Sequence, residues 1–356
     1  MACPFMNSSE STKGGADNQE MHYRTYLEVD TLLSLQKPVT EKKGNLCHDE
    51  HLFITVHQVY ELWFKQILKE LESVISLLQD HDSLPIAVRR LERATQILEH
   101  TTTQFPLLES MTPLDFREFR DHLAPASGFQ SHQFRYIENI VGVRPDDRVP
   151  YNRENYRVVF KDHKDVLDKF DATEKATSLL TAVNSWLEEV YDKEDAGENF
   201  WRIYEQTMKN FIGSKPNEEE KKAAADKFAS LLDEEDYKEC SKRGDRRLSY
   251  KAFKSALMVM MRRDECKYSE PYRFLQLLVT LDVTLTKWRF MHLMTVQQLI
   301  GPATAGTAGS SGVPYLKATL GDPLKVFLDL SHVTSLLLPR PLLKEAEERQ
   351  ALDNLE

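Results

Sequence analysis

The amino-acid sequence predicts an all-α fold, and two observations support this prediction. Glycine is scarce, with 13 in 356 residues, and residues 45–127, 143–196 and 245–300 contain none. A β-rich chain of this size needs many glycine turns, so these long stretches favour helices. In residues 48–78 apolar side chains recur at steps of three or four residues, the period of an amphipathic helix: Phe53, Val56, Tyr60, Phe64, Ile67, Leu71, Val74 and Leu78.

The predicted elements follow in order along the first third of the chain. The stretch HYRTYLEVDTLL, which contains Tyr23 and Tyr26, predicts a short N-terminal helix. The long helix of residues 48–78 begins with HDEH, whose acids we interpret as favourable charges at a helix start rather than as metal ligands. A second helix is expected over residues 85–103.

Capping residues predict three further helix starts. Thr112, Pro113 and Asp115 supply a capping hydroxyl, a proline at the first helical position and an acid in the first turn of a short helix that should end near Pro125. Ser249 should begin another helix. The sequence Ser269-Glu270-Pro271 should begin the last long helix, which runs to Ile300 and ends at Gly301.

Charge-rich sequence with few bulky apolar residues separates two apolar regions of the chain. We interpret residues 160–244 as a small helical insertion at the periphery of one large helical domain formed by residues 21–159 and 245–340. Residues 1–20 are expected to be a disordered N-terminus, and residues 341–356 a charged tail.

Composition and motifs exclude several classes of function. With 46 basic and 56 acidic residues the formal charge is -10, and no long basic run is present, so nucleic acid is not an expected partner. The four cysteines lie far apart, as free thiols of a reducing compartment do, and no apolar stretch approaches the ~18 residues of a membrane span. We therefore expect a cytoplasmic protein. The sequence has no GxGxxG, P-loop, GxSxG, HExxH or Glu-x-x-His motif.

Two histidines lie among apolar residues at helical spacing. His292 belongs to a stripe with Leu285, Trp288, Val296 and Leu299. It is either a core histidine bonded to a backbone carbonyl or a neutral imidazole of the kind that serves as the proximal ligand of haem iron. His57 has Phe53 one turn before it and Tyr60 after it, so the same two interpretations apply.

Arg120 and a glycine-rich loop are candidate ligand-binding elements. Arg120 shares a helix face with Phe116, and it either forms a surface salt bridge or holds a substrate carboxylate with a two-pronged bond. Residues 301–312, GPATAGTAGSSG, are either a passive linker or a loop that closes over a ligand.

Six strings, taken in order, resemble the tryptophan 2,3-dioxygenase family in its animal form: HDEHLFITVHQVYELWFKQ, DFREFRDHLAPASGFQS, RVPYNR, RRLSY, TKWRFMH and GTAGSSG. The resemblance covers residues 23–339. It implies an all-helical homotetramer with one haem b per chain, ferrous in the active state. The implied reaction inserts both atoms of O2 across the indole C2–C3 bond of L-tryptophan to give N-formyl-L-kynurenine, the first step of the kynurenine pathway.

The resemblance also implies roles for individual residues. In the cofactor site, His292 would be the axial ligand of the haem iron with Trp288 beside it. His57 would be the distal histidine that hydrogen-bonds the indole N–H, and Ser127 would line the distal side near the haem edge.

The implied substrate contacts come from several segments. Arg120 would clamp the carboxylate and Thr307 would bind the ammonium group. Phe53 and Phe116 would pack on the indole ring, and Tyr23 and Tyr26 would come from a neighbouring chain. The sequence departs from the family at Ala308, where a second glycine is usual, and in a slightly longer stretch before Thr307.

Three other functions compete with this interpretation. An indoleamine 2,3-dioxygenase-like enzyme of looser specificity would catalyse the same reaction, but its distal side lacks a histidine, so His57 argues against it. A non-catalytic haem sensor would need the iron ligand but not the arginine or the aromatic residues. A helical scaffold without a cofactor would need none of them.

Overall fold

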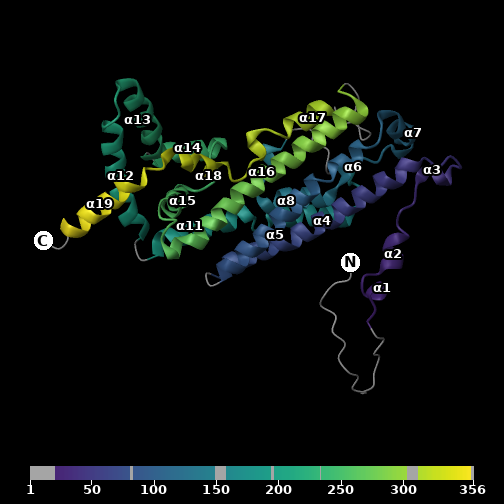
Figure 1. Ribbon diagram of the computed structural model, residues 1–356, viewed down its shortest axis with the longest axis horizontal. Coiled ribbons are helices and arrows are strands. Elements are labelled where there is room, and N and C mark those ends of the chain that lie inside the picture. Colours follow the sequence, from purple (N-terminus) through teal and green to yellow (C-terminus); the bar gives the residue numbers. More distant parts are fainter. Residues whose placement is uncertain are drawn as a thin grey trace, which may run out of the picture.

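The computed structural model describes residues 21–80, 83–148, 158–193, 196–232, 234–302 and 312–353 (Figure 1). Regular structure in these ranges is helical throughout, which confirms the all-α prediction. None of the helices in these ranges is both long enough and apolar enough to span a bilayer. Cys47, Cys240 and Cys266 are free thiols.

Three long helices form the centre of the molecule. They are α4 (His48–Leu78), α5 (Leu84–Thr102) and α16 (Cys266–Ile300), and α5 packs against both of the others. The bounds of α4 and α5 match the expected helices to within one residue. The stripe predicted on α4 faces the core, because every one of its members from Val56 to Leu78 is buried.

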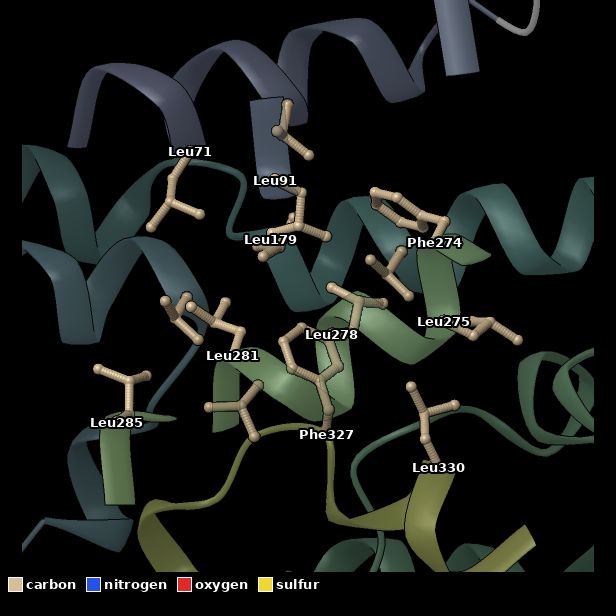
Figure 2. Close-up of a cluster of buried hydrophobic side chains, with 14 of the residues drawn as sticks. Leu71, Leu91, Leu179, Phe274, Leu275, Leu278, Leu281, Leu285, Phe327 and Leu330 are labelled. Carbon is tan, nitrogen blue, oxygen red and sulfur yellow. The ribbon is translucent and has the colours of Figure 1, made fainter. Parts of the chain in front are cut away.

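The centre of the core combines residues from distant parts of the sequence. Figure 2 shows Leu71 of α4, Leu91 of α5 and Leu179 of α11 (Leu179–Asp192) together with apolar residues of α16. Leu71, Leu91 and Leu179 are fully buried. Truncating one such leucine to alanine typically costs about 2–5 kcal/mol of stability, so this cluster holds the long helices in register.

The last long helix starts earlier than its sequence signals indicate. The expected start was Ser269-Glu270-Pro271, but α16 begins at Cys266 with Glu265 as its N-cap, and Pro271 lies inside the helix. Tyr268 is buried and its N–H donates to the carbonyl of Glu265 (2.9 Å). Tertiary packing of this turn therefore outweighs the local start signal. Gly301 ends the helix with φ +76°, as expected.

Short helices pack beside α4 and α16. They are α6 (Phe105–Glu109), α7 (Pro113–Leu123), η2 (Gly128–Gln130) and α8 (His132–Val141). The cap predicted for α7 is present as a capping box, because Asp115 N donates to Thr112 Oγ1 (3.2 Å) and Thr112 N donates to Asp115 Oδ2 (3.1 Å). The Asp115 carboxylate also accepts the Thr112 hydroxyl (2.6 Å), and this bond, with the bond from Thr112 N, lowers the pKa of the Asp115 carboxyl.

Residues of the expected insertion divide into two groups. Helix α11 packs against α4 and α15 (Tyr250–Met261), and its Trp186 contacts Phe274 of α16 with ring centroids 5.3 Å apart. The later helices α13 and α14 lie at the end of the molecule away from α7 (Figure 1). The division into domains stays a prediction. The helices between η3 (Pro145–Asp147) and α15 are α10 (Lys164–Lys175), α11, α12 (Ala196–Gly213), α13 (Glu218–Leu232) and α14 (Glu234–Arg243).

The N-terminal stretch forms two short helices rather than one. Helices α1 (Tyr23–Tyr26) and α2 (Val29–Leu33) are separated by Glu28, whose φ of +50° no helix interior allows. Both project away from the long helices in Figure 1. Helix α3 (Val39–Lys42) is tied to α4, because the buried Glu50 carboxylate accepts the N–H groups of Val39 (2.7 Å) and Thr40 (3.0 Å). Glu50 of the HDEH start is therefore a structural group.

The C-terminal part of the chain returns along α16 and then packs on α12. Its elements are α17 (Val313–Ala318), η5 (Asp322–Leu324), α18 (Leu328–Val333), η6 (Thr334–Leu336) and α19 (Arg340–Asp353). The expected charged tail is thus helical over its described part. The expected disorder of residues 1–20 lies outside the described residues.

Candidate active site

A cavity of about 710 Å³ lies among α4, α7, α8, α16 and α17. Its size is within the range of pockets that bury small-molecule ligands and cofactors. Seven residues predicted for the site line it together: Phe53, His57, Phe116, Arg120, Ser127, Trp288 and His292. Histidines from two helices far apart in the sequence thus face one space, which spacing alone could not establish.

His292 is a neutral imidazole with aromatic neighbours. Its ring lies 6.2 Å from Phe105 and 5.4 Å from Trp288 between centroids. Burial lowers the pKa of His292 to about 4, with smaller contributions from His57 and Arg135. Within the described part of the chain, neither ring nitrogen has a hydrogen-bond partner. The imidazole therefore keeps a lone pair that can bind a metal at neutral pH.

His57 has a defined tautomer. Its Nδ1 lies 2.7 Å from the carbonyl oxygen of Phe53, and because a carbonyl can only accept, Nδ1 carries the hydrogen. Burial lowers the pKa of His57, against the opposing effects of the Phe53 bond and Glu61. In the neutral ring Nε2 is then a hydrogen-bond acceptor available to a ligand.

Helices α4 and α7 supply an aromatic wall and a cation. Phe53 lies 5.6 Å from Phe116 and 5.5 Å from Phe119, between ring centroids. Arg120 follows Phe116 by one turn, its side chain is 19% exposed, and its Nη1 lies 3.9 Å from Oδ1 of Asp121. The shared face predicted for Phe116 and Arg120 is therefore turned toward the cavity.

Ser127 has a structural task as well as a place in the cavity wall. Its Oγ accepts the N–H of Phe129 (3.3 Å), and Gln130 Oε1 accepts the N–H of Ser127 (3.1 Å). The hydroxyl is thus held in position as the N-cap of η2. Ser127 and Gln130 have the S-x-x-Q spacing of a capping box, a signal that the sequence-based prediction of Ser127 did not use.

The structure does not confirm three of the predicted substrate contacts. Thr307, with Ala308, lies outside the described residues. Tyr23 and Tyr26 lie on α1 with 71% and 69% of their surface exposed, and they are not among the residues that line the cavity.

A charged cluster in the cavity wall was not predicted from the sequence. Arg135 and Glu138 of α8 and Arg289 of α16 all line the cavity and are all buried. Burial would raise the pKa of the Glu138 carboxyl, but Arg135, Arg289 and Arg148 outweigh it and hold the pKa at about 2. The available signal was an Arg and a Glu three residues apart among the apolar residues Phe134, Tyr136 and Ile137.

The set of donor groups fits haem better than a bare metal ion. Where the chain is described, no cluster of three or more His, Cys, Asp or Glu side chains could hold an ion. One neutral imidazole, a second imidazole in the same cavity and walls of Phe105 and Trp288 suit a flat, apolar group with a single protein ligand to its metal.

Comparison with known proteins gives consistent matches over almost the whole chain. A family model described as tryptophan 2,3-dioxygenase matches residues 7–337. This chain is similar to proteins named tryptophan 2,3-dioxygenase from three organisms. It is 40% identical to the one from Aedes aegypti, over 96% of this chain and 92% of that protein. It is 42% identical to the one from Xenopus tropicalis, over 93% of this chain and 84% of that protein, and 39% identical to the one from Anopheles gambiae, over 98% and 95%.

Proposed function

The chain belongs to the tryptophan 2,3-dioxygenase family, and we propose that the cavity between α4, α7 and α16 is its active site. The enzyme is an oxidoreductase that inserts both atoms of O2 across the C2–C3 bond of the L-tryptophan indole, giving N-formyl-L-kynurenine. The observation that supports this location is the meeting of His57 and His292 in one aromatic-walled cavity.

His292 would hold haem b. Its neutral imidazole would supply the nitrogen that binds the iron, and Trp288 and Phe105 would supply apolar walls beside the imidazole. When bound, the ferrous haem would supply the redox-active iron that the O2 chemistry needs.

His57 would orient the indole rather than deprotonate it. Its Nδ1–H is committed to the Phe53 carbonyl, so Nε2 can accept the indole N–H. Because its pKa lies below the ordinary 6.5, the imidazole is too weak a base to remove the feebly acidic indole proton outright. The hydrogen bond fixes which edge of the ring is presented for reaction.

The remaining side chains would recognise the amino-acid part of the substrate. Arg120 would bind the carboxylate with two parallel N–H donors. Phe53 and Phe116 would pack on the indole, and Ser127 would line the haem edge. Thr307, in the glycine-rich loop, would bind the ammonium group.

We propose a homotetramer in which Tyr23 and Tyr26 enter a neighbour's site. The exposure of both rings and the projection of α1 away from its own chain support this arrangement (Figure 1). A cytoplasmic location is proposed as well, and the free thiols of Cys47, Cys240 and Cys266 support it.

An indoleamine 2,3-dioxygenase-like enzyme is the nearest alternative, and it is not favoured. The relatives reported above carry the tryptophan 2,3-dioxygenase name. His57 also lines the cavity, whereas a histidine on the distal side is not expected of that alternative. A non-catalytic haem sensor does not account for Arg120 and Phe116 facing the same cavity.

One experiment tests the proposal. Protein purified with haem should absorb in the Soret region, and L-tryptophan added under reducing, oxygen-free conditions should shift that band. Admission of O2 should then yield N-formyl-L-kynurenine. Protein that takes up no haem on reconstitution, or that forms no product when loaded with haem, would contradict it.

A further inference from the structure

Glu138 joins two helices in the cavity wall. Its Oε2 accepts from Nη1 of Arg135, which lies one turn earlier on α8 (3.0 Å), and its Oε1 accepts from Nη2 of Arg289 on α16 (3.0 Å). All three side chains are buried, with 3–7% of their surfaces exposed. One carboxylate therefore bridges α8 and α16 at the level of the cavity.

Arg289 lies next to the residues that face the cavity from α16. It follows Trp288 directly and precedes His292 by three positions, so Arg289 and His292 are about 60° apart around the helix axis. Phe134 of α8 stacks on Trp288 with ring centroids 4.7 Å apart. The Arg289 guanidinium lies 6.0 Å from the centroid of the Phe134 ring. Anchoring Arg289 to α8 thus restrains the rotation of α16 at this point.

We infer that Glu138 is a positioning residue, which holds Arg289 so that α16 presents His292 to the cavity in one orientation. The inference rests on the proposed binding of haem by His292. Its physical basis is that a buried guanidinium needs a paired charge. Without the carboxylate, Arg289 would move toward other acceptors or water, and the helix turn that carries His292 would move with it.

The test uses the haem-loaded enzyme and the variant Glu138→Gln. We expect haem transfer to excess apomyoglobin to become about tenfold faster, the scale on which groups behind a metal ligand act. The iron–histidine stretching band of the ferrous protein should also shift, because the orientation of the imidazole changes. Neither readout depends on turnover.

Glu70→Gln is the matched control. Glu70 is also a buried carboxylate (5% exposed) that pairs with an arginine, Arg93 (3.1 Å), but it joins α4 to α5 and does not line the cavity. Its loss should lower thermal stability while leaving the haem-transfer rate and the stretching band as in wild type. Equal changes in both variants would reduce the role of Glu138 to general stability and overturn the inference.

A second variant keeps the test decisive if Glu138→Gln folds poorly. Arg289→Met leaves Glu138 paired with Arg135, and we expect the same band shift and faster haem transfer. The double variant should be no worse than the worse single variant, because the two residues act as one unit. Wild-type behaviour of Arg289→Met, or strictly additive effects, would overturn the inference. Wild-type protein that shows no histidine-ligated haem would instead refute the proposed function.

Discussion

His292 is the only histidine on α16, so no second imidazole can replace it from the same helix. We therefore predict that His292→Ala folds but loses most of its haem. The ratio of Soret to protein absorbance in the purified variant, with circular dichroism to verify the helix content, measures this. Full haem occupancy with an unchanged spectrum would show that another group binds the iron.

Arg120 should act on substrate affinity through its charge and its shape. Arg120→Leu leaves a bound carboxylate without its cation, and we expect substrate binding to weaken by about 2–5 kcal/mol. Tryptamine lacks the carboxylate, so its binding should weaken much less, and the preference for L-tryptophan over tryptamine should fall. The values of kcat/KM for both substrates measure the change.

Arg120→Lys separates charge from geometry. Lysine keeps the positive charge but cannot present two coplanar donors, so it should restore only part of the lost affinity. A leucine variant whose kcat/KM for L-tryptophan stays within a few fold of wild type would rule out the clamp.

The lowered pKa of His57 has a consequence for the pH profile. Since the folded protein favours the neutral imidazole of His57, Nε2 stays a hydrogen-bond acceptor at neutral pH. It loses this ability by protonation only as pH falls below 6.5, the ordinary pKa of histidine. We predict that kcat/KM for L-tryptophan is flat near neutral pH and declines on the acid side. His57→Ser should be less active and should lose this acid limb. An acid limb that persists unchanged in the serine variant belongs to another group.

The sequence pattern predicted which residues share a helix face, but it did not predict which helices pack against each other. The pairing of Phe116 with Arg120 needed only the helical repeat, and both residues do line the cavity. That His57 and His292 share this cavity depends on how α4, α5 and α16 pack, which no local pattern contains. Glu138 was missed because a charged residue on a helix is ordinarily solvent-exposed, and its burial depends on two arginine partners, Arg135 of the same helix and Arg289 of α16.

At the scale of helices, the start of α7 matters because this helix carries both Phe116 and Arg120. Thr112→Ala removes the hydroxyl that accepts the N–H of Asp115, and we expect the free energy of unfolding to fall by about 0.5–2 kcal/mol. Fraying of the first turn should also raise KM for L-tryptophan while changing kcat less. Urea unfolding and steady-state kinetics measure the two effects.

Ser178→Ala provides a control for that prediction. Ser178 caps α11 by accepting the N–H of Thr181 (3.2 Å), and it does not line the cavity. This variant should lose comparable stability without a change in KM. If both variants raise KM equally, the effect of Thr112→Ala comes from general destabilisation and not from the position of α7.

Helix starts show when local signals succeed. Thr112, Ser249 and their following residues act through hydrogen bonds to the first turn, so the sequence alone located α7 and α15. The start of α16 was misplaced by one turn, because the buried Tyr268 packs its turn into the core and the helix accommodates Pro271. Local chemistry decides a helix end only where packing does not compete with it.

At the scale of the whole molecule, residues 21–33 carry several apolar side chains that their own chain leaves exposed. Besides Tyr23 and Tyr26, the apolar residues Met21 and Leu33 are largely exposed there. An apolar segment of this kind is typical of a protein interface. Its proposed place in another chain's site rests on the family resemblance, since neither composition nor helical period refers to a second chain.

Co-expression of two defective chains tests the exchange of N-termini. Tyr26→Ala and His292→Ala should each be nearly inactive alone, the first through its substrate site and the second through loss of haem. In a mixed oligomer, a haem-loaded Tyr26→Ala chain can receive an intact Tyr26 from a His292→Ala neighbour. With equal expression, random pairing and one donor per site, about a quarter of all sites should be complete.

If Tyr26 instead lies in the site of its own chain, the two variants cannot complement each other. If Tyr26 served its own chain, every site in the mixture would lack either the tyrosine or the iron ligand, whatever the composition of the oligomer. The two chains should therefore carry different affinity tags, so that sequential purification isolates mixed oligomers before the assay. Mixed oligomers with activity near a quarter of wild type support the exchange, whereas activity equal to the sum of the two separate variants would refute it.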